Sequence, residues 1–189
     1  MRLADGTIGN SRESRTALVP AQPAAHRCPM SSLLDTVAEI DATWFGAGLS
    51  DQSRRHLAEL ARDYDAPAGA RLLREGDETR ELGVLVSGRV ALTQRVPGHE
   101  SVTIMTVDPG DIFGWTALIP PFIATSSFTA MAPVHVLALD GARLRTVLHT
   151  DLELAAGLYQ QLLEAVARRL MATRQQLLDV YRAEAMEPW

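Results

Sequence analysis

The sequence contains no lysine and only one cysteine, and both shortages narrow what the chain can do. A single thiol, Cys28, excludes an internal disulfide and a metal site built from several cysteines. The positive side chains are 18 arginines, which against 23 acidic residues leave a net charge of −5. An acidic chain without a basic stripe is a poor DNA-binding protein, so we expect no direct DNA binding.

Long apolar runs are also missing. No stretch reaches the roughly 18 consecutive apolar residues that a membrane-crossing helix needs. The N-terminus lacks the continuous apolar segment of a secretion signal. We therefore expect a cytoplasmic protein that does not associate with a membrane.

Residue groups that carry enzyme chemistry are equally scarce. The histidines lie far apart in the sequence, whereas a metal site in a β-roll enzyme needs them clustered; they are His26, His56, His99, His135 and His149. No Ser/His/Asp or Cys/His combination and no phosphate-binding glycine-rich loop stand out. The sequence predicts no enzyme activity, no catalytic residues, no metal and no resident cofactor. His135 lies among valines of a predicted strand, so we expect it in the core or at a sheet edge.

The spacing of apolar residues changes along the chain and divides it into segments. Ala, Pro, Arg and Ser dominate the start, which predicts disorder there. The predicted segments are a disordered tail at 1–30, N-terminal helices at 31–63, a β-roll at 64–140, a short and a long helix at 141–182, and a tail at 183–189. Asp35, Glu39 and Asp41 form an acidic face on the first helix, which we interpret as solvated, with docking of a partner protein as the alternative.

Residues 64–140 alternate between apolar and polar in short runs, as in Leu82, Val84 and Val86. Turn residues such as Gly76-Asp77 and Ser87-Gly88 separate the runs. Short strands at this spacing indicate an all-β sandwich or barrel. The predicted fold class is therefore mainly β with flanking helices.

A long helix capped by Asp151 is predicted to run to about Arg182. Apolar residues on it recur at alternating steps of three and four, the pattern of a coiled-coil seam. This apolar seam comprises Ala156, Tyr159, Leu163, Val166, Leu170, Thr173, Leu177 and Val180. A second row, Leu154, Leu158, Leu162 and Ala165, is expected to lie on the β-domain. The narrow seam predicts a parallel homodimer through this helix.

Three motifs occur in a fixed order: Pro67-Ala-Gly-Ala-Arg-Leu-Leu-Arg-Glu-Gly-Asp77, Leu85-Val-Ser-Gly-Arg-Val90 and Pro109-Gly-Asp-Ile-Phe-Gly114. Together they resemble the cyclic nucleotide-binding domain of the catabolite activator and fumarate–nitrate regulator superfamily, over about residues 49–181. The resemblance implies a double-stranded β-helix, or jelly roll, followed by a long C-terminal dimerisation helix. Relatives that bind DNA carry a helix-turn-helix after that helix. We expect none after Tyr181.

In this family the segment that corresponds to Phe113–Ser127, here called the cassette, holds the cyclic phosphate and the ribose. The resemblance implies a Glu for the ribose at the position of Trp115 and an Arg for the phosphate at about Ala124. No Arg or Lys occurs between Arg95 and Arg143, so the cassette itself supplies no replacement cation. We therefore expect weak binding of cyclic AMP and cyclic GMP. The pocket should be filled by Trp115, Leu118, Ile119 and Phe122, or reshaped for a less polar ligand.

Two residues of the long helix, Arg169 and Thr173, fall where the family contacts the purine. A simpler interpretation places Arg169 on a solvated flank and Thr173 as a polar break in the seam. The candidate ligand-binding residues are Phe113, Gly114, Trp115, Thr116, Ala117, Leu118, Thr125, Ser126, Arg169 and Thr173.

The sequence thus predicts a regulatory module with a degenerate cassette, which signals by repositioning the dimer helix. Its effector would be an unusual nucleotide or an apolar small molecule. The alternative is a ligand-free dimeric scaffold that docks a partner protein, and this alternative predicts a closed cassette.

Overall fold

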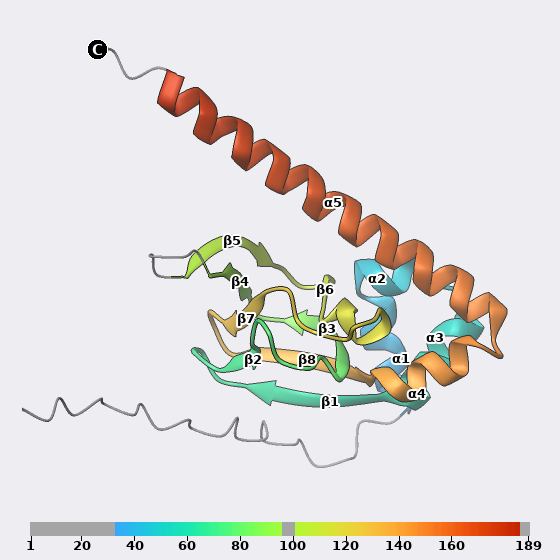
Figure 1. Ribbon diagram of the computed structural model, residues 1–189. Coiled ribbons are helices and arrows are strands. Elements are labelled where there is room, and N and C mark those ends of the chain that lie inside the picture. Colours follow the sequence, from blue (N-terminus) through green and yellow to red (C-terminus); the bar gives the residue numbers. More distant parts are fainter. Residues whose placement is uncertain (1–32, 96–100, 186–189) are drawn as a thin grey trace, which may run out of the picture.

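Two four-stranded antiparallel sheets face each other, with helices packed at one end, in the computed structural model of the chain (Figure 1). The structure describes residues 33–95 and 101–185. The predicted tail at 1–30, with Cys28, therefore lies outside the described residues, as do residues 186–189 of the second tail. Residues 183–185 are not a tail, because the last helix continues through Ala185.

The strand order identifies a jelly roll. One sheet has the order β1-β8-β3-β6 and the other β2-β7-β4-β5. The strands are β1 (Ala61–Ala66), β2 (Arg71–Leu73), β3 (Glu81–Ser87), β4 (Val90–Gln94), β5 (Val102–Val107), β6 (Ile112–Phe113), β7 (Ser127–Ala130) and β8 (Val134–Asp140). The predicted fold class is confirmed, although β1 begins at Ala61 and not at Tyr64.

Glycines at the predicted strand turns adopt left-handed backbone conformations. Gly76 and Gly88 have φ angles of +87° and +89°, a region that a side chain disfavours. At Gly88 a Cβ atom would also lie 2.3 Å from the carbonyl oxygen of Pro133. This turn therefore requires glycine for space as well as for its φ angle.

Three helices precede the β-roll: α1 (Leu33–Asp41), α2 (Trp44–Ala47) and α3 (Asp51–Leu60). The Ser50 side chain accepts a hydrogen bond from the Ser53 amide at 3.2 Å, as expected of an N-cap. Two of the three residues of the acidic face of α1 contact basic side chains of the same chain. Asp41 pairs with Arg54 at 3.0 Å, and Glu39 lies 3.5 Å from His135.

His135 is nearly buried on β8, as the sequence analysis expects. Its Nδ1 lies 2.8 Å from an oxygen of Asp65 on the neighbouring strand β1, and its Nε2 faces Glu39 on α1. The residue therefore links α1 to the first sheet.

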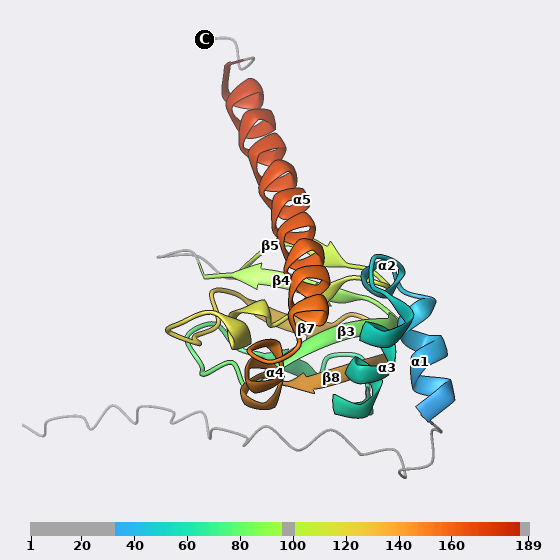
Figure 2. The same cartoon turned by 90° about the vertical axis from the view of Figure 1, so that its right-hand side faces the viewer.

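Two helices follow the roll, α4 (Gly141–Leu148) and α5 (Leu152–Ala185). Asp151 caps α5 by accepting a hydrogen bond from the Leu154 amide at 2.9 Å. The predicted packing row is buried as expected, at Leu154, Leu158, Leu162 and Ala165. Beyond that row α5 crosses the roll and extends past it (Figures 1 and 2).

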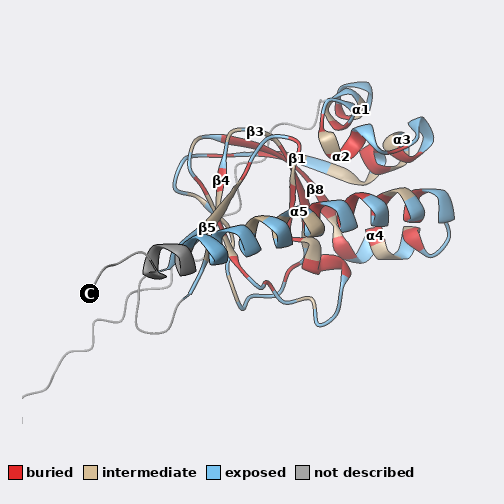
Figure 3. Cartoon of the chain, turned by 90° about the horizontal axis from the view of Figure 1, so that it is seen from above, coloured by how far each residue is buried: buried red, intermediate tan, exposed pale blue. Residues whose placement is uncertain are grey.

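The apolar seam of α5 lies largely in solvent, in contrast to the packing row (Figure 3). Tyr159, Leu163 and Leu170 are 51%, 69% and 59% exposed. Such a row of large apolar side chains is typical of a surface that another protein covers. None of the helices in residues 33–95 and 101–185 combines the length and apolarity that a membrane span needs.

Candidate functional site

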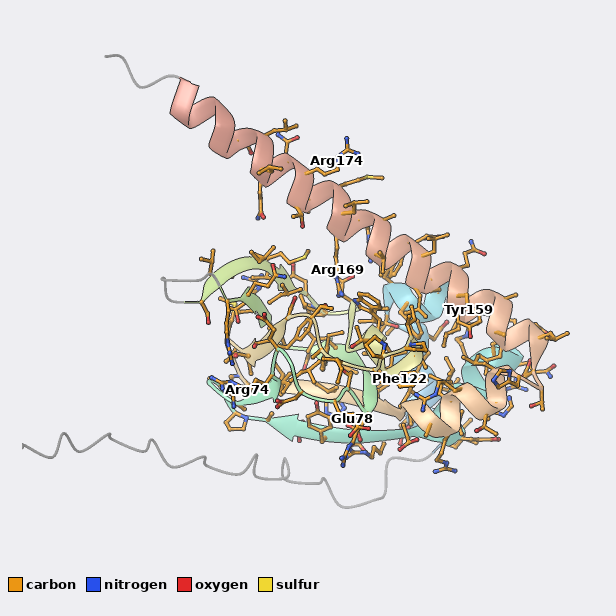
Figure 4. All side chains as sticks on the ribbon, viewed as in Figure 1. Arg74, Glu78, Phe122, Tyr159, Arg169 and Arg174 are labelled. Atoms are coloured by element: carbon orange, nitrogen blue, oxygen red, sulfur yellow. The ribbon has the colours of Figure 1, made fainter. Side chains whose placement is uncertain are left out.

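A pocket of about 250 Å³ opens between the cassette, the second sheet and α5. Its apolar wall consists of Leu73, Leu92, Ile104, Met105, Trp115, Ala124 and Phe128. Its other lining residues are Gln94, Gly114, Thr116, Thr125, Ser126, Arg169 and Thr173. We call this site the cassette pocket. In Figure 4 the Arg169 side chain reaches from α5 toward the β-roll.

Gly114 begins the short 3₁₀ turn η1 (Trp115–Leu118) in a left-handed conformation with φ of 70°. A Cβ atom there would lie 2.5 Å from the carbonyl oxygen of Glu81 on β3, so no other residue fits. The first N–H groups of such a turn have no partner inside it and can face an anion. Gly114 thus fixes where the turn presents these groups.

The turn is held by buried contacts beneath the pocket. The Thr116 hydroxyl donates to the Thr79 hydroxyl at 2.8 Å. Ala117 and Leu118 are buried and do not line the pocket. Arg145 of α4 donates to the carbonyl of Ala117 and lies over the Phe122 ring, 4.3 Å from its centre. The cassette is therefore a fixed surface with its backbone braced from α4.

Ala124, at the position where the resemblance implies an Arg, is tied to the turn before β3. Its amide donates to Asp77 and its carbonyl accepts from Gly76, both at 2.9 Å. The residue is 3% exposed and borders the pocket. The backbone at this position is thus fixed by two hydrogen bonds, and its side chain is an uncharged methyl group.

A cation reaches the pocket from α5 instead. One nitrogen of Arg169, Nη2, donates to the carbonyl of Ile112 on β6. The other, Nη1, is buried and has no hydrogen-bond partner among the residues that the structure describes. Burial lowers the pKa of this guanidinium, which nevertheless stays charged at neutral pH. The solvated-flank interpretation is therefore wrong for Arg169, although it describes Arg168, which is exposed.

Seven of the ten candidate residues line the cassette pocket: Gly114, Trp115, Thr116, Thr125, Ser126, Arg169 and Thr173. The other three, Phe113, Ala117 and Leu118, are buried outside its lining. Of the two expectations for the pocket, filling by side chains does not fit this open hollow, and a shape suited to a less polar ligand stays a prediction. Of the four residues proposed to fill it, only Trp115 borders it, since Leu118 is in the core and Ile119 is 50% exposed.

The strand residues that line the pocket were not among the residues predicted from the sequence. Leu92 and Gln94 alternate along β4 with the same period that identified the strand, so a signal for a shared face was present. The alternation shows that the two residues share one face of the strand. It does not show that this face lies beside the cassette.

A second hollow of about 240 Å³ is lined by residues from all four strands of the first sheet and from β2 of the second. Its charged residues already pair across its rim, Glu78 with Arg80 and Glu81 with Arg62. Of the ten candidate residues it contains only Phe113. The cassette pocket, which gathers seven, is therefore the better candidate site.

Known proteins with this arrangement were found in three comparisons. The model of the cyclic nucleotide-binding domain matches residues 65–151. A CRP-like cAMP-activated global transcriptional regulator of Mycobacterium tuberculosis is 28% identical over 133 residues, which cover 70% of this chain and 58% of that protein. The chain thus spans less than two thirds of the length of this curated relative.

Two solved structures agree. A protein of Geobacter metallireducens GS-15, described as a cyclic nucleotide-binding protein, is 30% identical with a TM-score of 0.63, covering 71% of this chain and 98% of that one. A cyclic nucleotide-binding domain from Methylobacillus flagellatus KT shares the fold, with a TM-score of 0.68 at 22% identity and 78% and 83% coverage. With its jelly roll, glycine-initiated cassette and long following helix, this chain belongs to the cyclic nucleotide-binding domain family.

Proposed function

We propose that the chain is a regulatory sensor in which an effector in the cassette pocket sets the position of α5. One observation carries the proposal: α5 supplies two lining residues, Arg169 and Thr173, to a pocket whose other walls belong to the roll. A ligand that contacts both parts has a differential affinity for different positions of the helix, which is the requirement for a shift in conformation.

A change in the position of α5 would be transmitted by the part of the helix that follows the packing row. Past the packing row, the helix is held to the roll by few polar contacts, including Gln176 to the carbonyl of Ile104 at 2.6 Å. Part of the exposed apolar seam, including Val166, Leu170 and Leu177, lies on the same stretch of helix. We propose that a second copy of the chain packs on this seam in parallel, so that movement of α5 changes the dimer.

Cyclic AMP and cyclic GMP are expected to bind weakly. A charge-assisted bond to the phosphate contributes on the order of 1.5–3 kcal/mol, and a carboxylate bond to the ribose roughly another 1–3 kcal/mol. Trp115 and Ala124 supply neither, which lowers the affinity by some two to four decades. Arg169 adds one positive charge, but from the helix rather than from the cassette.

The ligand-free scaffold predicts a cassette closed by its own side chains. The pocket beside Gly114 and Thr125 has a volume of about 250 Å³ and therefore favours the sensor. Enzyme activity is not part of the proposal, and the chemistry of the lining residues suits binding.

Calorimetric titration with cyclic AMP and cyclic GMP tests the cassette, and hydrogen exchange tests the coupling. We expect dissociation constants above about 100 μM for both nucleotides. At saturating millimolar cyclic AMP, amide exchange in residues 168–176 should change while that of the core strand β8 stays constant. Micromolar affinity for either nucleotide would contradict the degenerate cassette, and unchanged exchange in α5 at saturation would contradict the coupling.

A further inference from the structure

The cassette pocket combines one positive charge with a largely apolar wall. Among the lining residues in the described part of the chain, Arg169 is the one charged group, and no carboxylate borders the pocket. Hydroxyl and amide groups complete the polar lining, at Gln94, Thr116, Thr125, Ser126 and Thr173. A pocket of this charge attracts an anion and disfavours a cation.

The state of Arg169 shows that its charge is only partly compensated within the chain. Its neighbour Arg168 binds the Asp111 carboxylate, with Nη2 2.7 Å from Oδ1. Asp111 acts on Arg169 through space, whereas the hydrogen bond of Arg169 goes to the neutral carbonyl of Ile112. Two guanidiniums thus share one nearby carboxylate, which leaves a positive balance at the pocket wall.

A buried guanidinium nitrogen without a partner is costly, because a charged donor has lost its water. Nη1 of Arg169 is in this position. The Ile112 bond uses Nη2, so an incoming acceptor can bind Nη1 without breaking it. The Arg169 side chain borders the pocket, and an oxygen of a bound ligand that reached Nη1 would supply that acceptor.

The remaining wall selects the body of the ligand. Residues from β2, β4, β5 and β7 present apolar side chains, and Trp115 adds an indole. A dry cavity of about 150 Å³ holds a benzene-sized molecule, so a cavity of about 250 Å³ has room for a larger ring system bearing one acidic group. The indole and Phe128 offer aromatic surfaces against which such a ring can pack.

We infer that the effector of this module is a compact organic anion, a carboxylate on an aromatic or otherwise apolar body, whose acid group is bound by Arg169. This inference rests on the proposed sensor function and names the chemical class that its pocket takes. Arg169 would then both recognise the ligand and belong to the helix that the ligand positions.

The test compares naphthalene-2-carboxylate with its neutral amide, naphthalene-2-carboxamide, by calorimetry on the full chain. The two probes have nearly the same shape and differ in charge. We expect the acid to bind at least about tenfold more tightly than the amide, as a charge-assisted bond provides. Equal affinities, or no binding of the acid at millimolar concentration, would overturn the inference.

Two variants test whether Arg169 causes the preference for the acid over the amide. Arg169→Gln should reduce the acid-to-amide ratio to about one. Arg174→Gln, which removes an exposed guanidinium from the same helix (Figure 4), should leave the ratio unchanged. A ratio that survives Arg169→Gln would overturn the role of Arg169. The comparison of the two probes on the unaltered chain decides the ligand class even if Arg169→Gln does not fold.

The outcomes separate this inference from the sensor proposal. If the acid binds through Arg169 but exchange in residues 168–176 does not change, the ligand class stands and the coupling fails. If a cyclic nucleotide binds and moves α5 while the acid does not bind, the coupling stands and the ligand class is overturned.

Discussion

The guanidinium of Arg168 lies 3.6 Å from the centre of the Trp44 indole ring, and this contact joins the long C-terminal helix to the short helix α2. The same guanidinium binds Asp111, next to the β6 strand that Arg169 contacts. The two neighbouring arginines thus have different roles. Arg168 holds α5 against the outside of the fold, and Arg169 borders the cassette pocket.

Replacing Arg168 should weaken the attachment of α5 to the rest of the fold and keep the positive charge of Arg169 at the pocket. Arg168→Gln deletes the cation–π contact and the ion pair, and because both are partly exposed we expect a loss of only about 1 kcal/mol in the free energy of unfolding. Amide exchange in residues 168–176 should become faster. Arg174→Gln is the matched control on the same helix, and equal effects of the two variants would show that the Trp44 contact does not hold α5.

The apolar seam predicts the oligomeric state. In size-exclusion chromatography with light scattering at micromolar concentration, the chain should have twice its mass of 20.6 kDa. Leu163→Glu with Leu170→Glu puts two charges into the seam and should give the monomer mass. Met171→Glu, which changes an equally exposed residue outside the seam, should keep the dimer. A monomeric unaltered chain would refute dimerisation.

The sequence predicted the fold well because its signals are local. The period of two, the turn glycines and the capping residues Ser50 and Asp151 each depend on a few neighbouring residues. The packing row of α5 could be read in the same way, since its spacing puts Leu154, Leu158 and Leu162 on one side of the helix.

The site was only partly predictable because its lining depends on how distant segments are aligned. The sequence left Arg169 between a purine contact and a solvated flank, and only the position of α5 over β6 shows that it borders the pocket. Likewise, the sequence could not show that Ile119 points outward and leaves the pocket open.

Gly114, like Gly88, should be difficult to replace. In Gly114→Ala the left-handed φ and the 2.5 Å approach to the Glu81 carbonyl act together, and we expect a loss of roughly 2–4 kcal/mol in the free energy of unfolding. Gly69→Ala is the matched control, with φ of +82° but open space around a new Cβ, and should cost only about 1 kcal/mol. Urea denaturation measures both, and equal losses would mean that the close approach carries no cost.

Tyr64 predicts how stability depends on alkaline pH. Its burial, followed by the charge of Glu81, raises the pKa of its hydroxyl to about 12, from 10 in the unfolded chain. The folded state therefore favours the neutral form. This contribution is fully present below pH 10 and is lost as the pH rises from 10 to 12, by up to about 3 kcal/mol.

Unfolding by urea at pH 9 and near pH 12 tests this dependence. Tyr64→Phe should lose less stability over that interval than the unaltered chain. Tyr159→Phe, on the exposed surface of α5, should behave as the unaltered chain does. Identical pH dependence in the two variants would contradict the assignment to Tyr64.

Restoring the two missing groups should convert the cassette pocket into a cyclic nucleotide site. Trp115→Glu supplies a ribose acceptor and Ala124→Arg a phosphate cation, at positions that border the pocket and whose backbone is already ordered. We expect the double variant to bind cyclic AMP about 100-fold more tightly than the unaltered chain, measured by calorimetry.

The control places the same charge one residue away. Trp115→Glu with Ile123→Arg adds an arginine at a residue that pairs with Glu78 and does not line the pocket. This variant should gain little affinity, because a cation outside the pocket stays in water and is screened from the phosphate. A similar gain in both variants would mean that net charge controls binding. No gain in either would mean that the weak affinity arises from the shape of the cassette and not from its missing groups.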